Sequence, residues 1–281
     1  MKKKKMSGFI FVLIFFAGLS LLLYPSVANL INKMHGSKAI SDYSDSVSEL
    51  NAEEYEKMIG AAREYNRSLI HKANPYFVND SQKALYEELL NIGGNGVMGY
   101  IEIPAISVML PVYHGTDENT LQKAVGHLDW TSLPVGGESS HCVLSGHRGL
   151  PSAMLFTNLD KLVEGDVFML RVLNEVLTYE VDQILIVLPQ NSSDLQIALG
   201  EDYCTLVTCT PYGINSHRLL VRGHRIENEE SAESVRVISE AVQIDQAIVA
   251  SVLALPTLIL MLIAMSLKPK RRRSRGGSEF E

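Results

Sequence analysis

The sequence predicts a mainly β fold, in which strands form a barrel or a sandwich, with helices before it and an apolar segment near each end of the chain. Three observations predict this. From residue 97 onward, short apolar runs rich in β-branched residues alternate with turns that contain glycine or proline. Before that point, apolar residues recur at three- and four-residue steps, as in amphipathic helices. Two uncharged stretches of about 20 residues lie near the termini.

The first apolar segment covers residues 7–28 and follows four lysines at residues 2–5. A helix of this length would span the ~30 Å hydrocarbon core of a bilayer. A lysine-rich start, an apolar stretch and the small residues at 26–28 fit a cleavable signal peptide just as well. We therefore assign residues 1–32 to an N-terminal signal or anchor segment, and both alternatives stay open.

The second apolar segment, residues 247–267, runs into a basic stretch that starts at Lys268. It predicts a transmembrane helix, in which Pro256 is tolerated. Positive charges next to both spans predict cytoplasmic termini and an extracellular middle at the cell membrane. Residues 230–246 are then a juxtamembrane linker, and residues 268–281 a basic cytoplasmic tail.

The charge is unevenly distributed along the chain. The net charge is −7, from 25 Lys and Arg against 32 Asp and Glu. Many of the basic residues lie in the two terminal runs, so the middle of the chain is strongly acidic. This argues against a nucleic-acid partner and against electrostatic docking on an anionic membrane surface. Other exported proteins or cationic groups are the expected partners.

Residues 33–95 are expected to form a helical region. It starts with a polar stalk, rich in Ser and Asp, at residues 33–47. A helix is predicted over residues 51–70, where apolar side chains recur at helical spacing. Glu53 and Glu54 would lie in its first turn, where the helix dipole favours negative charge.

A break and a second helix follow. The segment Asn74-Pro75-Tyr76 interrupts the helical pattern, and a short helix is expected over residues 81–90 with Ser81 as its N-cap. The glycines at 93, 94 and 96 then mark a flexible boundary before the β region.

Residues 96–229 are assigned to the β domain. Strands are expected at residues 100–103, 108–113, 142–147, 167–172, 177–187, 205–209 and 217–225. The clearest alternation of apolar and polar side chains lies at residues 177–182. Seven or more strands fit a barrel or a sandwich. We favour a barrel, because the candidate functional groups come from three separate strand ends and must converge.

Three side chains at strand ends could together carry acyl-transfer chemistry. Cys209 closes the strand-like run at residues 205–209, and Arg218 follows after a short turn on the next strand. His147 ends another apolar run, at residues 142–147. A thiol can act as nucleophile, an imidazole can transfer protons, and a guanidinium can stabilise the developing oxyanion.

Each of these residues also has a simpler interpretation. A free cysteine is often a small buried hydrophobe. Arg218 and Arg222 could both form surface salt bridges. His217 competes with His147, although neighbouring strand residues point to opposite faces, so only one of His217 and Arg218 can face Cys209.

The remaining cysteines and histidines predict no metal site and no cofactor. Cys142 and Cys204 are expected to be buried structural thiols. A disulfide between Cys204 and Cys209 is not expected, because one extended strand would hold the two residues too far apart. His141 and His147 bracket a strand but lack further ligands at zinc spacing. No phosphate-binding glycine motif precedes a helix.

Longer motifs resemble those of the sortase family. Residues 205–209, TLVTC, match the TLxTC motif of sortases, and residues 205–223 are similar to the class C, pilin-polymerising branch. Residues 127–137, 143–151 and 155–160 resemble the same branch. The resemblance is dense from residue 97 to residue 226 and extends to the helical region and both apolar segments.

The resemblance implies a closed eight-stranded sortase-type β-barrel with His147, Cys209 and Arg218 as a catalytic triad. It implies that the Cys209 thiolate attacks the Thr–Gly bond of an LPxTG-like sorting signal, that Arg218 holds the oxyanion, and that His147 protonates the leaving amine. A lysine of a pilin subunit would then convert the thioester into an isopeptide bond. A sortase that anchors proteins to peptidoglycan, a non-catalytic pilus scaffold and a hydrolytic cysteine protease remain alternatives.

The expected lid departs from the family pattern. Class C sortases usually carry an Asp-Pro-aromatic lid, whose carboxylate pairs with the catalytic arginine and whose ring covers the cysteine. The matching segment here is Asn74-Pro75-Tyr76. An asparagine cannot form a charge-assisted pair with Arg218. We predict that Tyr76 still covers Cys209, with a weaker polar contact, unless the lid has shifted by one residue.

Overall fold

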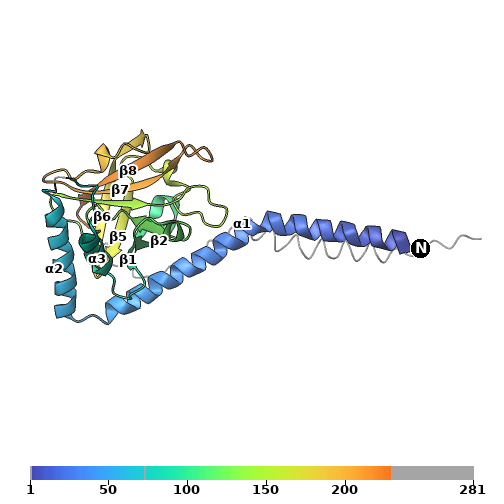
Figure 1. Ribbon diagram of the computed structural model, residues 1–281, viewed down its shortest axis with the longest axis horizontal. Coiled ribbons are helices and arrows are strands. Elements are labelled where there is room, and N and C mark those ends of the chain that lie inside the picture. The colour runs from blue at the N-terminus through green and yellow to red at the C-terminus, as the bar shows by residue number, and fades with distance from the viewer. Residues whose placement is uncertain (1, 73, 229–281) are drawn as a thin grey trace, which may run out of the picture. The chain divides into compact units, whose positions relative to one another are not determined.

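Eight strands form a closed β-barrel (Figure 1) in the computed structural model, which describes residues 2–72 and 74–228. They are β1 (Val97–Ile103), β2 (Val108–His114), β3 (Val125–His127), β4 (Ser140–Ser145), β5 (Val167–Val172), β6 (Glu175–Val187), β7 (Asp202–Thr210) and β8 (His217–Ile226). The order around the barrel is β1-β2-β3-β4-β7-β8-β6-β5, and β5 closes it by pairing with β1. The mainly β fold and the eight-stranded closed barrel are thereby confirmed. The predicted linker at 230–246, second span at 247–267 and tail at 268–281 lie outside the described residues.

Four α-helices precede or interrupt the described strands. They are α1 (Lys2–Ser48), α2 (Ala52–Leu69), α3 (Asp80–Glu88) and the short α4 (Glu118–Leu121). Three 3-10 turns are η1 (Pro104–Ile106), η2 (Leu159–Lys161) and η3 (Ser193–Leu195). Of the described helices, α1 is long and apolar enough to cross a membrane, a test that an N-terminal signal sequence also passes.

The predicted polar stalk at residues 33–47 is instead the C-terminal part of α1. Tyr43 and Val47 are buried there against Val97 of β1. The Tyr43 hydroxyl donates to the Met98 carbonyl at 3.1 Å and accepts from the Leu173 backbone N–H at 2.7 Å. These contacts explain the helix, because tertiary packing of one face stabilises a polar sequence that has little helical signal of its own.

Asparagine caps set the start of the next two helices. Asn51 accepts a hydrogen bond from the Glu54 backbone N–H, so α2 begins where the sequence predicts. In α3 the cap is Asn79 rather than Ser81, which corrects the prediction. The Asn79 side chain accepts from the Gln82 N–H at 2.9 Å, and the Gln82 side chain bonds back to the Asn79 N–H. Such a reciprocal cap satisfies two backbone donors at once.

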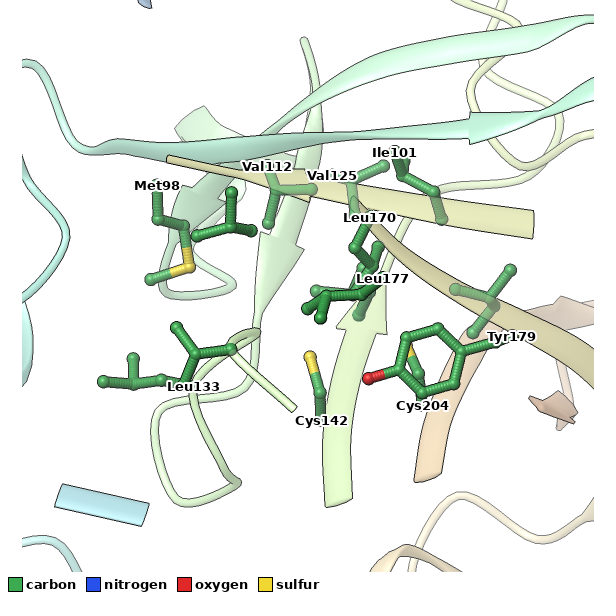
Figure 2. Packing of buried hydrophobic residues seen from close by; sticks show 14 of the residues in the cluster. Met98, Ile101, Val112, Val125, Leu133, Cys142, Leu170, Leu177, Tyr179 and Cys204 are labelled. Carbon is green, nitrogen blue, oxygen red and sulfur yellow. The ribbon is translucent and has the colours of Figure 1, made fainter. Parts of the chain in front are cut away.

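The main hydrophobic core fills the barrel. In Figure 2, Cys142 of β4 and Cys204 of β7 lie near Leu177 and Tyr179. The two cysteines pair directly across the parallel strands and are 2% and 0% exposed. Burial raises the pKa of the Cys204 thiol well above its ordinary value. The prediction that Cys142 and Cys204 are buried structural thiols is confirmed by the burial of both side chains in the core.

A second apolar cluster, called the outer cluster below, involves the opposite faces of β4, β7 and β8. Successive strand residues point to opposite faces of the sheet. Cys142, Leu144, Cys204 and Leu206 point into the main core, so the residues between them point to the outer face. The outer cluster consists of Val143, Leu195, Val207 and Leu220, with the partly buried Leu128, Trp130, Leu185 and Val187 packed against it.

Candidate active site

Cys209 and Arg218 lie directly opposite each other on neighbouring strands. β7 and β8 are antiparallel, and their register pairs Cys209 with Arg218 and Thr210 with His217. Paired residues point to the same face of a sheet, with Cα atoms about 4.5–5.5 Å apart. Arg218 therefore shares the face of Cys209, whereas His217 points to the other side. By alternation this is also the face of Val207, so the two residues adjoin the outer cluster.

The segment after β4 carries His147 to the end of β7. β4 and β7 are parallel, and Ser145 pairs with Val207. Beyond that pair, the Gly146 backbone N–H donates to the Val207 carbonyl at 3.0 Å. His147 therefore lies two positions past the Ser145–Val207 pair on its segment, as Cys209 does on β7. The predicted strand through His147 is corrected, because β4 ends at Ser145.

Close packing explains why glycines flank His147. A Cβ atom on Gly146 would lie 2.7 Å from the ring of Phe156, closer than side-chain atoms approach. The Phe156 backbone N–H in turn donates to the His147 carbonyl at 3.2 Å. Gly149 has a φ of +78°, which favours glycine. The segment around His147 therefore needs glycine for a close approach at position 146 and for a turn at position 149.

The His147 imidazole has an uncommitted nitrogen. Its side chain is 27% exposed, yet Nε2 is itself shielded from water and has no hydrogen-bond partner among the described residues. The nearest carboxylate oxygen, Glu118 Oε2 of α4, lies 3.9 Å away. A ring nitrogen without a fixed partner is available for proton transfer. Glu118 was not identified from the sequence. The one local indication is Asp117, an N-cap residue that predicts a helix beginning at Glu118.

The guanidinium of Arg218 is held by backbone carbonyls. Its Nη1 donates to the carbonyls of Asn215 and His217 at 3.3 and 3.1 Å. In the part of the chain that the structure describes, no carboxylate forms a salt bridge with it. Arg222 is different, since it pairs with Asp182 at 2.9 Å. The salt-bridge interpretation therefore holds for Arg222 and is wrong for Arg218, whose charge stays available for an anion.

The segment predicted as a lid lies over the outer cluster. The Tyr76 ring meets the Trp130 ring edge-on, with 4.9 Å between the ring centroids. The Gln196 side-chain amide donates to the Tyr76 hydroxyl at 2.9 Å. A small cavity of about 20 Å³, lined by Pro75, Trp130 and His141 among others, lies beneath this segment. Tyr76 therefore docks on the cluster that continues toward Cys209 along β7.

The Asn74 side chain stabilises a local turn. Its side-chain oxygen accepts from the Tyr76 backbone N–H at 3.2 Å. Over residues 2–72 and 74–228, no hydrogen bond connects Asn74 with Arg218. That Tyr76 covers Cys209 stays a prediction.

Both ring nitrogens of His141 form hydrogen bonds. Its Nδ1–H donates to the Gln196 carbonyl at 2.8 Å, and its Nε2 accepts from the Thr205 hydroxyl at 2.7 Å. Burial lowers the pKa of His141 to about 4, so the ring is neutral near pH 7. Within the described ranges, no group of three or more His, Cys, Asp or Glu residues could hold a metal ion.

Comparisons with known proteins agree with this architecture. A family model described as the sortase domain matches residues 101–226. Sortase C1 from Streptococcus agalactiae is 51% identical with a TM-score of 0.67, over 68% of this chain and 100% of that one. Sortase C from Streptococcus pneumoniae is 46% identical with a TM-score of 0.62, over 68% and 97%. Sortase C from Clostridium perfringens, solved with the C-terminal cell wall sorting motif, is 45% identical with a TM-score of 0.61, over 68% and 100%.

Curated relatives match a shorter part of the chain. Sortase D of Bacillus subtilis is 32% identical over 131 residues, which is 46% of this chain and 63% of that protein. The chain thus spans less than two thirds of that relative's length. A closed eight-stranded barrel, a thiol paired with an arginine at the end of β7, and full-length matches to solved sortase C structures point to one conclusion: the chain belongs to the sortase family.

Proposed function

We propose that this chain is a membrane-anchored cysteine transpeptidase that joins pilin subunits through an isopeptide bond. Cys209 is the nucleophile, Arg218 binds the oxyanion, and His147 transfers protons. The observation that carries the proposal is the direct pairing of Cys209 with Arg218, whose charge is unbalanced by any described carboxylate, beside the segment that bears His147.

The first half-reaction forms a thioester. The Cys209 thiolate attacks the threonine carbonyl carbon of an LPxTG-like sorting signal, and Arg218 donates hydrogen bonds to the oxyanion that develops. The C–N bond to glycine then breaks, and protonated His147 gives its proton to the leaving amine. The uncommitted Nε2 of His147 supports this role.

The second half-reaction forms the isopeptide bond. A lysine amine of another pilin subunit attacks the thioester carbonyl, and neutral His147 accepts its proton. The C–S bond breaks, Cys209 leaves as the thiolate, and the threonine is joined to the lysine. Each enzyme group returns to its starting protonation state, so the cycle needs neither a cofactor nor an oxidant.

The outer cluster supplies an apolar floor next to the thiol. Val207 lies two residues before Cys209 on the same face of β7, and Val187 pairs with Arg218 across β6 and β8. A leucine and a proline upstream of the scissile threonine fit such an apolar surface. The sorting motif with which the Clostridium perfringens neighbour was solved and the pilin substrate specificity named for the Streptococcus pneumoniae neighbour support the same substrate class.

The proposed topology puts the barrel on the outer cell surface. The apolar part of α1 would cross the membrane, and residues 247–267 would cross it again, leaving both termini in the cytoplasm. This arrangement would put Cys209 outside the cell, where exported pilin subunits would meet it.

Intact-mass spectrometry of the full chain with an LPxTG-like peptide tests the proposal. The expected result is an adduct that raises the mass by the acyl fragment ending in threonine and that is missing in Cys209→Ala. A non-catalytic scaffold would give no adduct. Supplying either a pilin lysine or a peptidoglycan stem peptide as acceptor then separates polymerisation from wall anchoring. Release of the acyl group to water alone, with both acceptors present, would identify a protease.

A further inference from the structure

α1 joins the apolar segment to the barrel without a break. It is one helix from Lys2 to Ser48, and its last turns pack on β1 through Tyr43 and Val47. Its apolar residues 7–28 would extend about 33 Å, which matches the hydrocarbon core of a bilayer. In a membrane-crossing α1, Asn29 would therefore lie at the outer membrane interface.

Two asparagines just after the apolar segment bind loops of the barrel. The Asn29 side-chain oxygen accepts a hydrogen bond from the Met154 backbone N–H at 3.0 Å. One helical turn later, the Asn32 side-chain amide donates to the Lys123 carbonyl at 3.2 Å. These bonds hold two barrel loops within side-chain reach of the point where α1 would leave the membrane.

Both loops adjoin His147. The loop with Met154 continues to Phe156, whose backbone N–H donates to the His147 carbonyl. Lys123 follows α4, whose Glu118 lies 3.9 Å from the His147 imidazole. The end of the barrel that α1 holds nearest to the membrane is therefore the end that carries the active site.

Apolar side chains are exposed at this end. Met154 is 42% exposed, and in the turn between β7 and β8 Tyr212 and Ile214 are 61% and 72% exposed. The two loops touch, because a Cβ atom on Gly149 would lie 2.9 Å from the Tyr212 ring. We call Met154, Tyr212 and Ile214 the apolar rim. Aromatic and aliphatic side chains of this kind are favoured at a membrane interface and are costly in water.

We propose that the apolar rim contacts the outer surface of the bilayer that α1 crosses, so that Cys209 faces substrates at the membrane surface. The inference rests on the membrane anchorage in the proposed function. The contact is apolar, since the acidic barrel would be repelled by anionic lipid, and it therefore needs neither anionic lipid nor low salt. A sorting signal still attached to its own membrane segment would be presented at the same depth.

Depth-dependent quenching in lipid tests the contact. Single cysteines, Met154→Cys or Ile214→Cys, would be made in a full-length Cys209→Ala chain, in which Cys142 and Cys204 are buried and do not react. The chain would be placed in phosphatidylcholine vesicles and labelled with a fluorophore. Leu199→Cys is the matched control, since Leu199 is 74% exposed but precedes β7, a strand about 30 Å long, whereas Ile214 follows it.

The expected result is that spin-labelled lipid lowers the fluorescence at positions 154 and 214 but not at 199, in high salt as in low salt. Equal quenching at the three positions, or none, overturns the proposal. A change in fluorescence at positions 154 and 214 that requires added pilin would assign the rim to a protein partner. That result would also overturn the proposal.

An activity comparison separates this inference from the proposed function. Met154→Asp should cleave a soluble sorting peptide at the wild-type rate yet polymerise a membrane-anchored pilin more slowly, whereas Leu199→Asp should change neither rate. Equal polymerisation by the wild type and Met154→Asp would contradict the rim. Failure of the wild type to cleave the soluble peptide would instead contradict the proposed function.

Discussion

At the scale of single residues, the candidate site keeps one charge without a counter-charge and one ring nitrogen without a hydrogen bond. The Arg218 guanidinium is oriented by two backbone carbonyls of its own turn and forms no salt bridge with a described carboxylate. The His147 Nε2 is shielded from water, and no described group satisfies it. Unpaired polar groups of this kind cost stability, and active sites are where they are retained.

Replacement of Arg218 should affect the chemical step. We expect Arg218→Ala to lower the rate of thioester formation by about 10²–10³, which is the usual effect of removing an oxyanion donor. Arg218→Lys should restore only part of this rate, because an ammonium group lacks the planar fork of donors. Single-turnover peptide cleavage measures both. Arg222→Ala is the control, since Arg222 is engaged by Asp182, and a loss of equal size there would argue against a specific role for Arg218.

Glu118 should have a smaller effect. Its carboxylate lies 3.9 Å from His147 and is 70% exposed, so solvent screens the interaction. We expect Glu118→Gln to lower kcat for peptide cleavage about two- to fivefold, in line with the weak energy of exposed ion pairs. Glu138→Gln is the matched control, because Glu138 is an exposed glutamate that precedes β4, whereas His147 follows that strand. An unchanged kcat in Glu118→Gln would show that the contact has no role in proton transfer.

The candidate residues of the site could be singled out from the sequence, but their neighbours could not. Strand alternation allows only one of Arg218 and His217 to face Cys209, and the register shows that it is Arg218. Strand alternation could not predict the contact with Glu118, because tertiary packing brings α4 close to His147. Ion-pair partners are likewise set by tertiary packing, as the contrast between Arg218 and Arg222 illustrates.

At the scale of elements, the lid segment docks by its aromatic ring rather than by charge. Tyr76 contacts Trp130 through its ring and Gln196 through its hydroxyl, while Asn74 stabilises only the local turn. An edge-to-face ring pair contributes about 1 kcal/mol beyond the area that it buries.

Thiol labelling measures how well the lid protects Cys209. We expect faster labelling in Tyr76→Ala and an intermediate rate in Tyr76→Phe, which keeps the ring but loses the hydrogen bond to Gln196. Phe77→Ala is the matched control, because Phe77 is a neighbouring ring that is 62% exposed. The buried Cys142 and Cys204 do not contribute to the signal. Identical rates in Tyr76→Ala and the wild type would remove the lid role.

The link between β4, β7 and the loop before β7 should weaken in acid. His141 joins them as a neutral ring, and its pKa falls from 6.5 to about 4 on burial. Between these values the unfolded chain binds more protons than the folded one, so the free energy of unfolding decreases as the pH falls from 6.5 toward 4. Urea unfolding across this range should show a shallower pH dependence in His141→Gln. His71→Gln, at an exposed histidine, should follow the wild type; identical slopes in all three would contradict the assignment.

Elements with a strong internal pattern were predictable, and those stabilised by distant contacts were not. The helix at residues 51–70 and seven of the eight described strands follow their apolar periodicity. The three-residue β3 carries too little pattern to detect, and it exists because it bridges β2 and β4. The stalk was mispredicted because only Tyr43 and Val47 distinguish it from a solvated segment.

At the scale of the whole molecule, the barrel brings together groups from distant parts of the chain. Parallel pairing of β4 with β7 and antiparallel pairing of β7 with β8 place the His147 segment, Cys209 and Arg218 side by side. The apolar segment of α1 ends where Asn29 binds the loop of Met154, so the same end of the barrel is held by the apolar helix. Topology, rather than sequence proximity, therefore sets both the site and its proposed position at the membrane.

The most direct test of the account is mass spectrometry of the product formed by the full-length chain and pilin subunits that carry an LPxTG-like signal. The account predicts a cross-linked peptide in which the threonine carbonyl is joined to a lysine side chain, formed by the wild type and absent with Cys209→Ala. Pilin that is only hydrolysed after threonine, or polymer that still forms with Cys209→Ala, would contradict it.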